Sequence, residues 1–582
     1  MRYLRMLTNA ALGGAFGAAF VAVIFLQLNP ELPLVPSVVV PLYAVIFLFY
    51  GAHIAVAFYV LLVARELFAR EALSPGWLSL RLLAWESAFV AAGATLLMWF
   101  NLQGFRLEMD TETVRGLTAG TAATAVCTVL LFIIAVVHYS VGRRATRAGA
   151  MLLVLAGAAS LALPVAARGL GRAPVGEPRR TAVPRIEADT SGARVVVVLF
   201  DGASLEYIAP ATAQGRLPNF GRLLDQGASM HLTTLRPTQP AAVWAAAFTG
   251  KAPQRNGIRS AATYAFGSDP HRITLLPDML FSYALVYFGV LDEHPHTSKD
   301  LRASILWQVL GRAGITVGVV GLPLTDPVEP LPGFMVSDRA TSAGSVRLAL
   351  EGQDLAYPPR LFERVPLPPD RPVPGSDGPE LGGVPPDPLL SGRPGPTARD
   401  AWFAALAERL EAEYAPRVTL LRLTGIDLAG HYYLRYAMPR EFGDVSEADQ
   451  RRFGEVLDQQ YAAADAEIGR VLASLAPGDV LLVVSGFGMQ PVTLGKRLLA
   501  QVLQQPALTG SHERAPEGFL LAYGSQVASG KFPLGSVTDV APTVLYLLGL
   551  PVGRDMDGYA RTDILRPEYS AGRPITFIAS YD

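Results

Sequence analysis

One carboxylate and two imidazoles stand out as side chains that could hold a metal ion together. Asp427 and His431 are four residues apart, with Gly430 just before the histidine, and His512 follows much later in the chain. Three such ligands would leave one coordination position open, which is typical of catalytic rather than structural zinc sites. The sequence therefore predicts one well-formed site for a divalent metal, with zinc as the expected ion and Asp427, His431 and His512 as its ligands.

The stretches before these polar residues predict buried strands. Val195–Phe200 is a continuous apolar, β-branched run, and Asp201 follows it directly. Two further runs are of roughly this kind. They are Val418–Leu423, which leads into the aspartate and histidine pair, and Val480–Val484, which leads into Ser485–Met489. Continuous apolar runs of this length are typical of strands buried on both faces of a parallel sheet. Ligands gather at the carboxyl ends of such strands, so these polar positions are expected to lie together.

Helical stretches alternate with the strands and indicate the fold class. They lie near residues 217–226, 398–414 and 447–475. This alternation predicts an α/β domain with a mostly parallel sheet. We assign residues 194–582 to this domain, including an insertion at 355–400 that is rich in proline and glycine and predicted to lack regular structure.

The first third of the chain has a different composition. Half of the 582 residues are hydrophobic and only 17% are charged, and the apolar excess lies almost wholly before residue 168. A membrane-spanning helix needs about 20 apolar residues, and five stretches are long enough, near residues 8–27, 38–64, 82–101, 118–139 and 149–167. The sequence predicts an all-α transmembrane domain of five helices over 1–167, followed by a linker at 168–193.

The positions of arginine in the short loops predict the orientation. The arginines concentrate before the first stretch, between the second and third, and between the fourth and fifth, at Arg2, Arg5, Arg65, Arg70, Arg81, Arg143, Arg144 and Arg147. Because basic loops stay in the cytoplasm, we expect a multi-pass protein of the cytoplasmic (inner) membrane with a cytoplasmic amino terminus. The large domain would then be periplasmic or extracellular. Five arginines between residues 168 and 185 argue against this orientation.

Composition also excludes some classes of function. The net charge is −1, and no basic patch or module that binds nucleic acid is found. Cys127 is the single cysteine, which excludes an intramolecular disulfide and a cysteine-based zinc site. The expected partners are therefore the membrane and a phosphorylated small molecule or lipid, whereas the oligomeric state is not indicated.

Several ordered motifs between residues 194 and 565 resemble one family. They are Asp201 after the first strand, the helix Leu217–Leu224, the Asp427 and His431 pair, His512, and the late stretch Thr538–Pro551 followed by Asp555–Gly558. Together they resemble the type I phosphodiesterase and nucleotide pyrophosphatase branch of the alkaline phosphatase superfamily. The resemblance implies an alkaline-phosphatase-like three-layer domain, metal-dependent chemistry on phosphoric esters, and Asp201 as a further metal ligand.

Two segments depart from the pattern of that family. Its Ser-Asp-His-Gly motif, which supplies two ligands to a second metal, is replaced here by a segment with Gly486 and Phe487 in the ligand positions. In the segment that ends in Thr249 and Gly250, the commonest family spacing places the nucleophile on Pro240, which has no nucleophilic atom. The nearest hydroxyl is on Thr238, at the start of an expected helix whose free N–H groups would hold a phosphate.

We therefore expect Thr238 to be the catalytic nucleophile, with Thr233 and Thr234 as alternatives. The predicted function is a membrane-anchored, metal-dependent phosphoric-ester hydrolase of the phosphodiesterase or phosphatase type, acting outside the cytoplasmic membrane in a bacterial envelope. Two alternatives stay open. One is a phosphoryl-group transferase that modifies an envelope lipid or glycan. The other is a degenerate, non-catalytic member that binds a phosphorylated ligand and lacks the second metal site.

Overall fold

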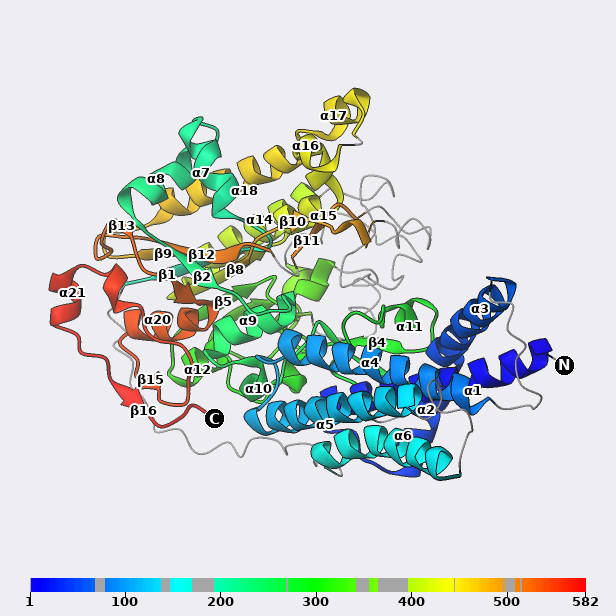
Figure 1. The fold of residues 1–582 in the computed structure, drawn as a ribbon. Helices are drawn as coiled ribbons and strands as arrows, with labels where there is room; N and C mark the ends of the chain where they lie inside the picture. Colours follow the sequence, from blue (N-terminus) through cyan, green and yellow to red (C-terminus); the bar gives the residue numbers. More distant parts are fainter. Residues whose placement is uncertain are drawn as a thin grey trace. The chain divides into compact units, whose positions relative to one another are not determined.

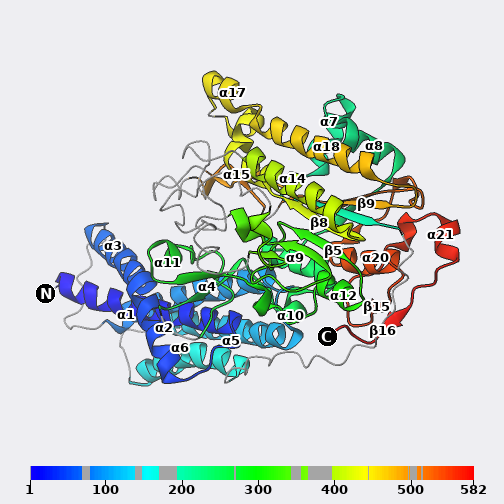
Figure 2. The same cartoon turned by 180° about the vertical axis from the view of Figure 1, so that it is seen from behind.

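The computed structural model describes residues 2–68, 79–137, 147–169, 193–267, 271–341, 355–364, 396–443, 445–495, 497, 508–512 and 515–582 (Figures 1 and 2). The chain divides into two compact units. The first comprises Met1–Gly176 and Ala262–His294, and the second comprises Glu177–Ala261 and Pro295–Asp582. Most of the predicted linker and of the predicted insertion, at residues 170–192 and 365–395, lies outside the described residues.

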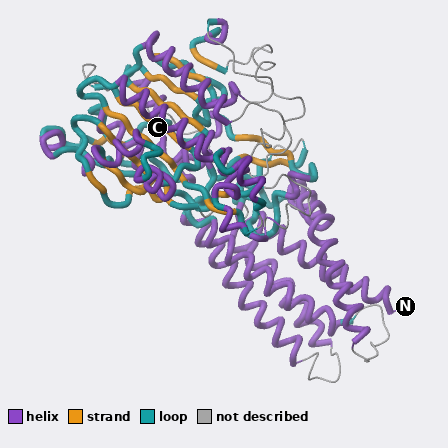
Figure 3. The backbone as a smooth tube through the Cα atoms, turned by 90° about the horizontal axis from the view of Figure 1, so that it is seen from above, coloured by secondary structure: helices purple, strands orange, loops and turns teal. Residues whose placement is uncertain are grey.

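Long apolar helices build the first unit, drawn in purple in Figure 3. They are α1 (Arg2–Leu28), α2 (Pro36–Ile46) continued by the π-helical turn η1 (Phe47–Gly51) into α3 (Ala52–Phe68), α4 (Leu80–Gly104), α5 (Thr111–Val136) and α6 (Arg147–Arg168). Within the described residues, five stretches could cross a membrane by length and composition, namely Tyr3–Leu28, Pro36–Arg65, Leu80–Gly104, Thr111–Val136 and Arg147–Arg168. The prediction of five long apolar helices before the α/β domain is confirmed. This domain, residues 194–582, is the outer domain of the predicted topology.

Local sequence explains where these helices begin and how closely they pack. Ser79 and Asp110 precede α4 and α5, and each side chain accepts a hydrogen bond from a backbone N–H in the first turn, as N-cap residues do. Helix α1 approaches η1 so closely that a Cβ atom at Gly14 would lie 2.3 Å from the carbonyl oxygen of Gly51. Glycine at this point therefore allows the two backbones to meet.

The first unit also contains residues 262–294, which the sequence places between two parts of the outer domain. This segment includes β3 (Ala262–Ala265), α11 (Ala284–Tyr287) and β4 (Asp292–Pro295), and β3 pairs with β4. Buried apolar side chains of the segment form one cluster with side chains of α1 and α2. The long apolar helices α1 and α2 are thus packed against a stretch of chain that is remote from them in sequence.

A ten-stranded sheet organises the second unit, with nine strands in the order β13-β2-β12-β9-β1-β8-β5-β6-β7 and β14 paired with β2. Its strands are β1 (Val195–Phe200), β2 (Ala228–Thr233), β5 (Val317–Val320), β6 (Gly333–Val336), β7 (Ala356–Tyr357), β8 (Val418–Leu423), β9 (Val480–Phe487), β12 (Glu517–Tyr523), β13 (Gly530–Lys531) and β14 (Gly535–Ser536). The central strands β9, β1, β8, β5 and β6 are parallel, whereas β12 is antiparallel to both β9 and β2. Phe200 at the end of β1 is paired with Leu423 at the end of β8, so their carboxyl ends meet at one edge.

Helices cover both faces of this sheet. Val195, Val197 and Leu199 of β1 belong to one core with α9, α12 and α20. The alternate residues of β1 belong to a second core with α8, α14 and α18. Because successive side chains of a strand point to opposite faces, the two cores lie on the two sides of the sheet. The predicted α/β class with three layers and a mostly parallel sheet is confirmed.

The remaining elements of the second unit complete these layers. Its helices are α7 (Leu205–Ala213), α8 (Pro218–Gln226), α9 (Pro240–Thr249), α10 (Pro253–Asn256), α12 (Leu306–Arg312), α14 (Pro396–Tyr414), α15 (Gly425–Ala437), α16 (Pro439–Phe442), α17 (Glu447–Phe453), α18 (Val456–Ser474), α20 (Val540–Leu547) and α21 (Pro567–Ala571). Two small sheets pair β10 (Gln490–Pro491) with β11 (Gly510–Ser511) and β15 (Val552–Gly553) with β16 (Phe577–Ile578).

One buried carboxylate joins two of the helices on the same face. Asp465 on α18 accepts the backbone N–H groups of Asn219, at 3.0 Å, and Phe220, at 2.8 Å, in the first turn of α8. Its second oxygen accepts the side-chain amide of Asn219 at 3.0 Å. A side chain from α18 therefore caps α8, whose own N-cap residue, Leu217, cannot do so.

We predict that Asp465→Ala lowers the stability of the outer domain by about 1–3 kcal/mol, because buried N–H donors lose their acceptor. Thermal unfolding of the purified protein in detergent measures the change. Asp458→Ala on the same helix is the control, because its ion pair with Arg216 is exposed and worth at most about 1 kcal/mol. Equal shifts for the two variants would contradict the capping role.

Candidate metal centre

The predicted metal ligands lie at the carboxyl edge of the parallel strands. Asp427 is in the first turn of α15, which follows β8, and His431 is one turn further along the same helix. His512 directly follows β11. The backbone N–H of Thr509 donates to the carbonyl of His431, and this bond holds the strand that carries His512 against α15.

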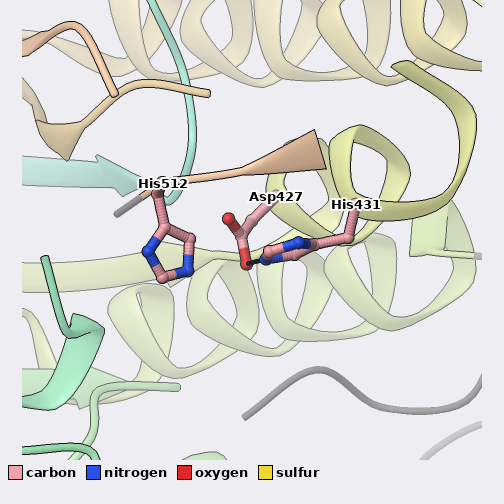
Figure 4. A group of neighbouring side chains, drawn as sticks. All are labelled: Asp427, His431 and His512. Carbon is pink, nitrogen blue, oxygen red and sulfur yellow. Dashed lines mark ion pairs between the residues drawn. The ribbon is translucent and has the colours of Figure 1, made fainter. Parts of the chain in front are cut away.

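Close backbone contact makes this convergence possible. A Cβ atom at Gly510 would lie 2.3 Å from the carbonyl oxygen of Gly430. Glycine at residue 510 therefore lets β11 lie directly against α15. Figure 4 shows the result, with Asp427, His431 and His512 facing one another.

The three side chains form a compact group of possible ligands. One ligand atom from each of Asp427, His431 and His512 lies within 4.8 Å of the other two. The Nε2 atom of His431 is 3.6 Å from Oδ2 of Asp427, and the two imidazole rings are 5.2 Å apart. Both histidines are buried and the aspartate is partly buried. The sequence-predicted triad is therefore assembled by elements from distant parts of the chain.

Hydrogen bonds orient both imidazoles in the way that metal-binding histidines require. Nδ1 of His431 is 2.9 Å from the carbonyl oxygen of Gly510, and Nδ1 of His512 is 3.1 Å from the carbonyl oxygen of Thr238. A carbonyl oxygen only accepts hydrogen bonds, so Nδ1 carries the proton in each ring and Nε2 keeps its lone pair. Partners of this kind fix the tautomer of metal ligands.

The carboxylate of Asp427 also suits a cation. Its Oδ1 atom is buried and has no hydrogen-bond partner in the part of the chain that the structure describes. An unpartnered buried carboxylate oxygen is costly unless a positive charge compensates it. Two nitrogen ligands and one oxygen ligand fit a divalent ion such as zinc, with a coordination position left for substrate or water.

Asp201 is in a different environment from the one expected of a metal ligand. It is not part of such a group among the described residues. Its buried carboxylate accepts hydrogen bonds from the Arg422 guanidinium, with Nε 3.0 Å from Oδ1, and from Nε1 of Trp244 at 2.9 Å. Burial alone would lower the pKa of Arg422, but the charges of Asp201 and Asp338 raise it above its ordinary value, so the guanidinium is charged.

The neighbouring residues of β9, Gly486 and Phe487, are closely packed. The Phe487 ring is fully buried, 4.9 Å from the His512 ring and 6.4 Å from the Trp244 ring. A Cβ atom at Gly486 would lie 2.5 Å from Cγ1 of Val243 on α9. Neither side chain offers a metal-binding atom, and any side chain added at residue 486 would meet Val243.

A family model of known proteins matches this chain. The family model for type I phosphodiesterase / nucleotide pyrophosphatase matches residues 195–525, which is more than half of the chain. The chain belongs to this family. No curated protein matches the chain at a significant level. The type I phosphodiesterase family is metal-dependent and hydrolytic, and the triad is the part of this member that fits a metal ion.

Two solved structures of murine ectonucleotide pyrophosphatase / phosphodiesterase 5 are similar to this family member. Each is 15% identical and covers 64% of this chain and 100% of the solved chain, with TM-scores of 0.38 and 0.37. One of them is an inactive variant in complex with AMP.

The segment predicted to carry the nucleophile lies beside the triad. The backbone carbonyl of Thr238 accepts the hydrogen bond from His512, and its buried hydroxyl donates to the carbonyl of Leu235 at 2.8 Å. Helix α9 begins at Pro240 rather than at Thr238, because proline is favoured at the first helical position. The threonine is therefore two residues before the helix.

The alternative threonines have other surroundings. Thr233 ends β2 and is exposed. The backbone N–H of Thr234 donates to Glu517 at 2.8 Å, and its hydroxyl is buried without a hydrogen-bond partner among the described residues. Thr238, by contrast, is hydrogen-bonded through its backbone to a member of the triad.

Arg422 and Trp244, which both bind Asp201, are not among the site residues predicted from the sequence. A charged residue inside the apolar run of β8 was the available signal for Arg422, since a buried charge needs a partner. Because β8 is paired with β1 in the sheet, the partner of Arg422 is Asp201, which follows β1.

We predict that Gly486→Ala destabilises the outer domain by about 1–3 kcal/mol, because the new methyl group overlaps Val243. In a Val243→Ala background the same change should cost less than about 1 kcal/mol, because the clashing Cγ1 atom is gone. Thermal unfolding of the four proteins of this cycle measures the coupling. Gly572→Ala is the control, because a Cβ atom there meets nothing within 4 Å. Additive effects of the two changes would contradict the close packing of β9 against α9.

Proposed function

We propose that this protein is a membrane-anchored, metal-dependent phosphoric-ester hydrolase that acts outside the cytoplasmic membrane, with Thr238 as its nucleophile. The observation that carries the proposal is the triad of Asp427, His431 and His512, with both imidazoles oriented by backbone carbonyls. Family membership supplies the reaction class, namely the hydrolysis of phosphoric esters. Zinc is the proposed ion, and a phosphorylated small molecule or lipid is the proposed substrate.

The triad is proposed as the only divalent metal site. A bound ion there would neutralise charge on the phosphoryl oxygens and on the departing ester oxygen. The charge of Asp201 is already compensated by the guanidinium of Arg422. This ion pair supports a role for Asp201 that does not involve a metal. The ring of Phe487 and the contact at Gly486 support the same conclusion.

The proposed chemistry at Thr238 needs one rotation of its side chain. The hydroxyl donates to Leu235 in the resting arrangement, and turning about the Cα–Cβ bond releases it. The hydroxyl then loses its proton to solvent, and its oxygen forms a bond to phosphorus while the ester oxygen leaves and takes up a proton. Water breaks the resulting phosphothreonine and restores the hydroxyl.

One observation favours a second candidate function, a phosphate-binding protein without turnover. The hydroxyl of Thr238 is buried and already hydrogen-bonded to a backbone carbonyl. In that arrangement the triad could still hold a phosphorylated ligand through its metal ion.

We predict that purified wild-type protein hydrolyses aryl phosphate monoesters or diesters and that Thr238→Ala lowers this rate roughly a hundredfold or more, because the attacking oxygen is removed. Release of the aryl alcohol measures the rate. Asp427→Ala should cause a loss of similar size. Thr212→Ala, which removes an exposed hydroxyl of α7, is the matched control and should keep the full rate.

The same assay separates the two candidates. Equal rates for wild type, Thr238→Ala and Asp427→Ala would mean that the chain does not catalyse this reaction. Binding of an aryl phosphate without turnover, lost in Asp427→Ala and kept in Thr238→Ala, would favour the binding protein.

We also predict about one zinc ion per chain in the purified protein, because one group of three ligands is formed. His431→Gln should lose this ion, whereas Asp201→Asn should retain it, because Arg422 and not a metal compensates Asp201. Elemental analysis by mass spectrometry measures the zinc content, and thermal unfolding confirms that each variant is folded. Two ions in the wild type, or loss of an ion in Asp201→Asn, would overturn the proposal of a single site.

A further inference from the structure

A short apolar stretch in the first unit has no role in the function proposed above. Met279–Leu291, here called the apolar segment, contains thirteen consecutive residues without a charged side chain. It includes α11 and is grouped with the long apolar helices rather than with the outer domain. Crossing a bilayer takes about 20 helical residues, so this segment is too short to span a membrane.

The apolar segment has apolar side chains on both of its faces. Leu285 and Leu291 are buried in one cluster with Phe25 of α1 and Leu42 of α2. On the other face Met279 and the two phenylalanines of the segment are 49–64% exposed. A chain that meets water normally carries polar residues on its outer face, and a contiguous exposed apolar patch indicates an apolar partner.

Two buried asparagines fix the backbone just before the apolar segment. Asn29, after α1, accepts the N–H groups of Thr274 and Leu275 at 2.8 and 2.9 Å and donates to the carbonyl of Leu275 at 2.9 Å. Asn101, in the last turns of α4, accepts the N–H of Asp278 at 2.8 Å and donates to its carbonyl at 3.3 Å. These bonds fix the positions along α1 and α4 at which the start of the segment contacts the helices.

These positions correspond to one boundary of a bilayer. Asn101 follows Arg81 by twenty residues on α4, which is about 30 Å of helix and matches the thickness of a hydrocarbon core. Asn29 follows Arg5 by twenty-four residues on and just beyond α1, which is about 36 Å. Both asparagines therefore lie where the hydrocarbon would end, opposite the side marked by the two arginines.

The exposed face of the segment is continuous with the apolar surface of the second span. The ring of Phe288 is 5.9 Å from the ring of Phe49 in η1. Leu48, which precedes Phe49 in η1, is 71% exposed, and Val40, earlier in the same candidate span, is 62% exposed. A surface shared with a membrane-spanning stretch indicates lipid as the partner.

We propose that the apolar segment inserts into the outer boundary of the bilayer that the helices cross, with Met279, Phe281 and Phe288 in contact with lipid. Its aromatic residues suit the boundary between headgroups and hydrocarbon, where such side chains concentrate. The outer domain is then attached to the membrane at two places in the sequence, after α6 and through residues 262–294. This inference does not depend on catalytic activity.

The single cysteine of the chain makes a direct test possible. In a Cys127→Ala background, Phe281→Cys and Phe288→Cys are labelled with a nitroxide in the full-length protein, which is placed in nanodiscs of phosphatidylcholine and phosphatidylglycerol. Electron paramagnetic resonance then compares collisions with oxygen, which concentrates in lipid, and with a water-soluble nickel chelate. Val126→Cys, on an exposed face of α5, is the lipid control, and Asp292→Cys, exposed on β4, is the water control.

We expect the labels at residues 281 and 288 to give an oxygen-to-nickel collision ratio well above that of the Asp292 label and below that of the Val126 label, because residue 126 lies near the middle of α5 and the segment lies at the boundary. A ratio equal to that of the Asp292 label would overturn the proposal. Low collision with both reagents would overturn it as well, because the face would then be covered by protein. If either phenylalanine variant fails to fold, as judged by size-exclusion chromatography, Met279→Cys reports on the same face.

Discussion

The ion pair between Arg422 and Asp201 is the interaction on which the centre of the outer domain depends. Asp201 ends the central strand β1, between β8 and β9, where water is excluded. A carboxylate without a partner there would cost several kcal/mol. Arg422, from the adjacent strand, supplies the opposite charge, and Trp244 supplies a further donor from α9. This pairing positions α9, and with it the segment that carries Thr238.

Two neighbouring aspartates illustrate how the environment divides roles between like side chains. The oxygens of Asp201 receive hydrogen bonds from a guanidinium and an indole, whereas Asp427 keeps a buried oxygen without a hydrogen-bond partner among the described residues. Their backbones are close, since a Cβ atom at Gly202 would lie 2.9 Å from Oδ1 of Asp427. Of these two carboxylates, Asp427 is the one that an added cation would stabilise, and it lies beside two oriented imidazoles.

Much of this arrangement could be predicted from the sequence, because it depends on local patterns. The apolar runs identify β1, β8 and β9, and the rule that ligands gather at the carboxyl ends of parallel strands places Asp427 and His431 at this edge. His512 follows the small antiparallel pair of β10 and β11 instead, and it was predicted as the third ligand from its residue type. The partner of Arg422 could not be predicted in this way. Asp201 is 221 residues away in sequence, and the pair exists only because β1 and β8 are neighbours in the sheet.

Other features escaped prediction for different physical reasons. The apolar segment is too short to give the signal of a membrane span, and its attachment depends on Asn29 and Asn101, which bind backbone groups and so follow no side-chain pattern. Thr238 was expected at the start of a helix. Helix α9 begins at Pro240 instead, two residues later. The hydroxyl then finds a backbone acceptor in the turn before the helix.

The packing around β9 bears on whether the proposed single metal site is a damaged version of a two-metal site. A site that had only lost ligands would leave Asp201 as an unpaired buried charge and a cavity where the ligands had been, and both are costly. Here Arg422 pairs with the charge, and the Phe487 ring lies between His512 and Trp244. Restoring a histidine at residue 487 would remove that packing, and restoring an aspartate at residue 486 would require Val243 to move. The residues around Asp201 thus pack against and pair with one another, which is what the proposed one-metal arrangement requires.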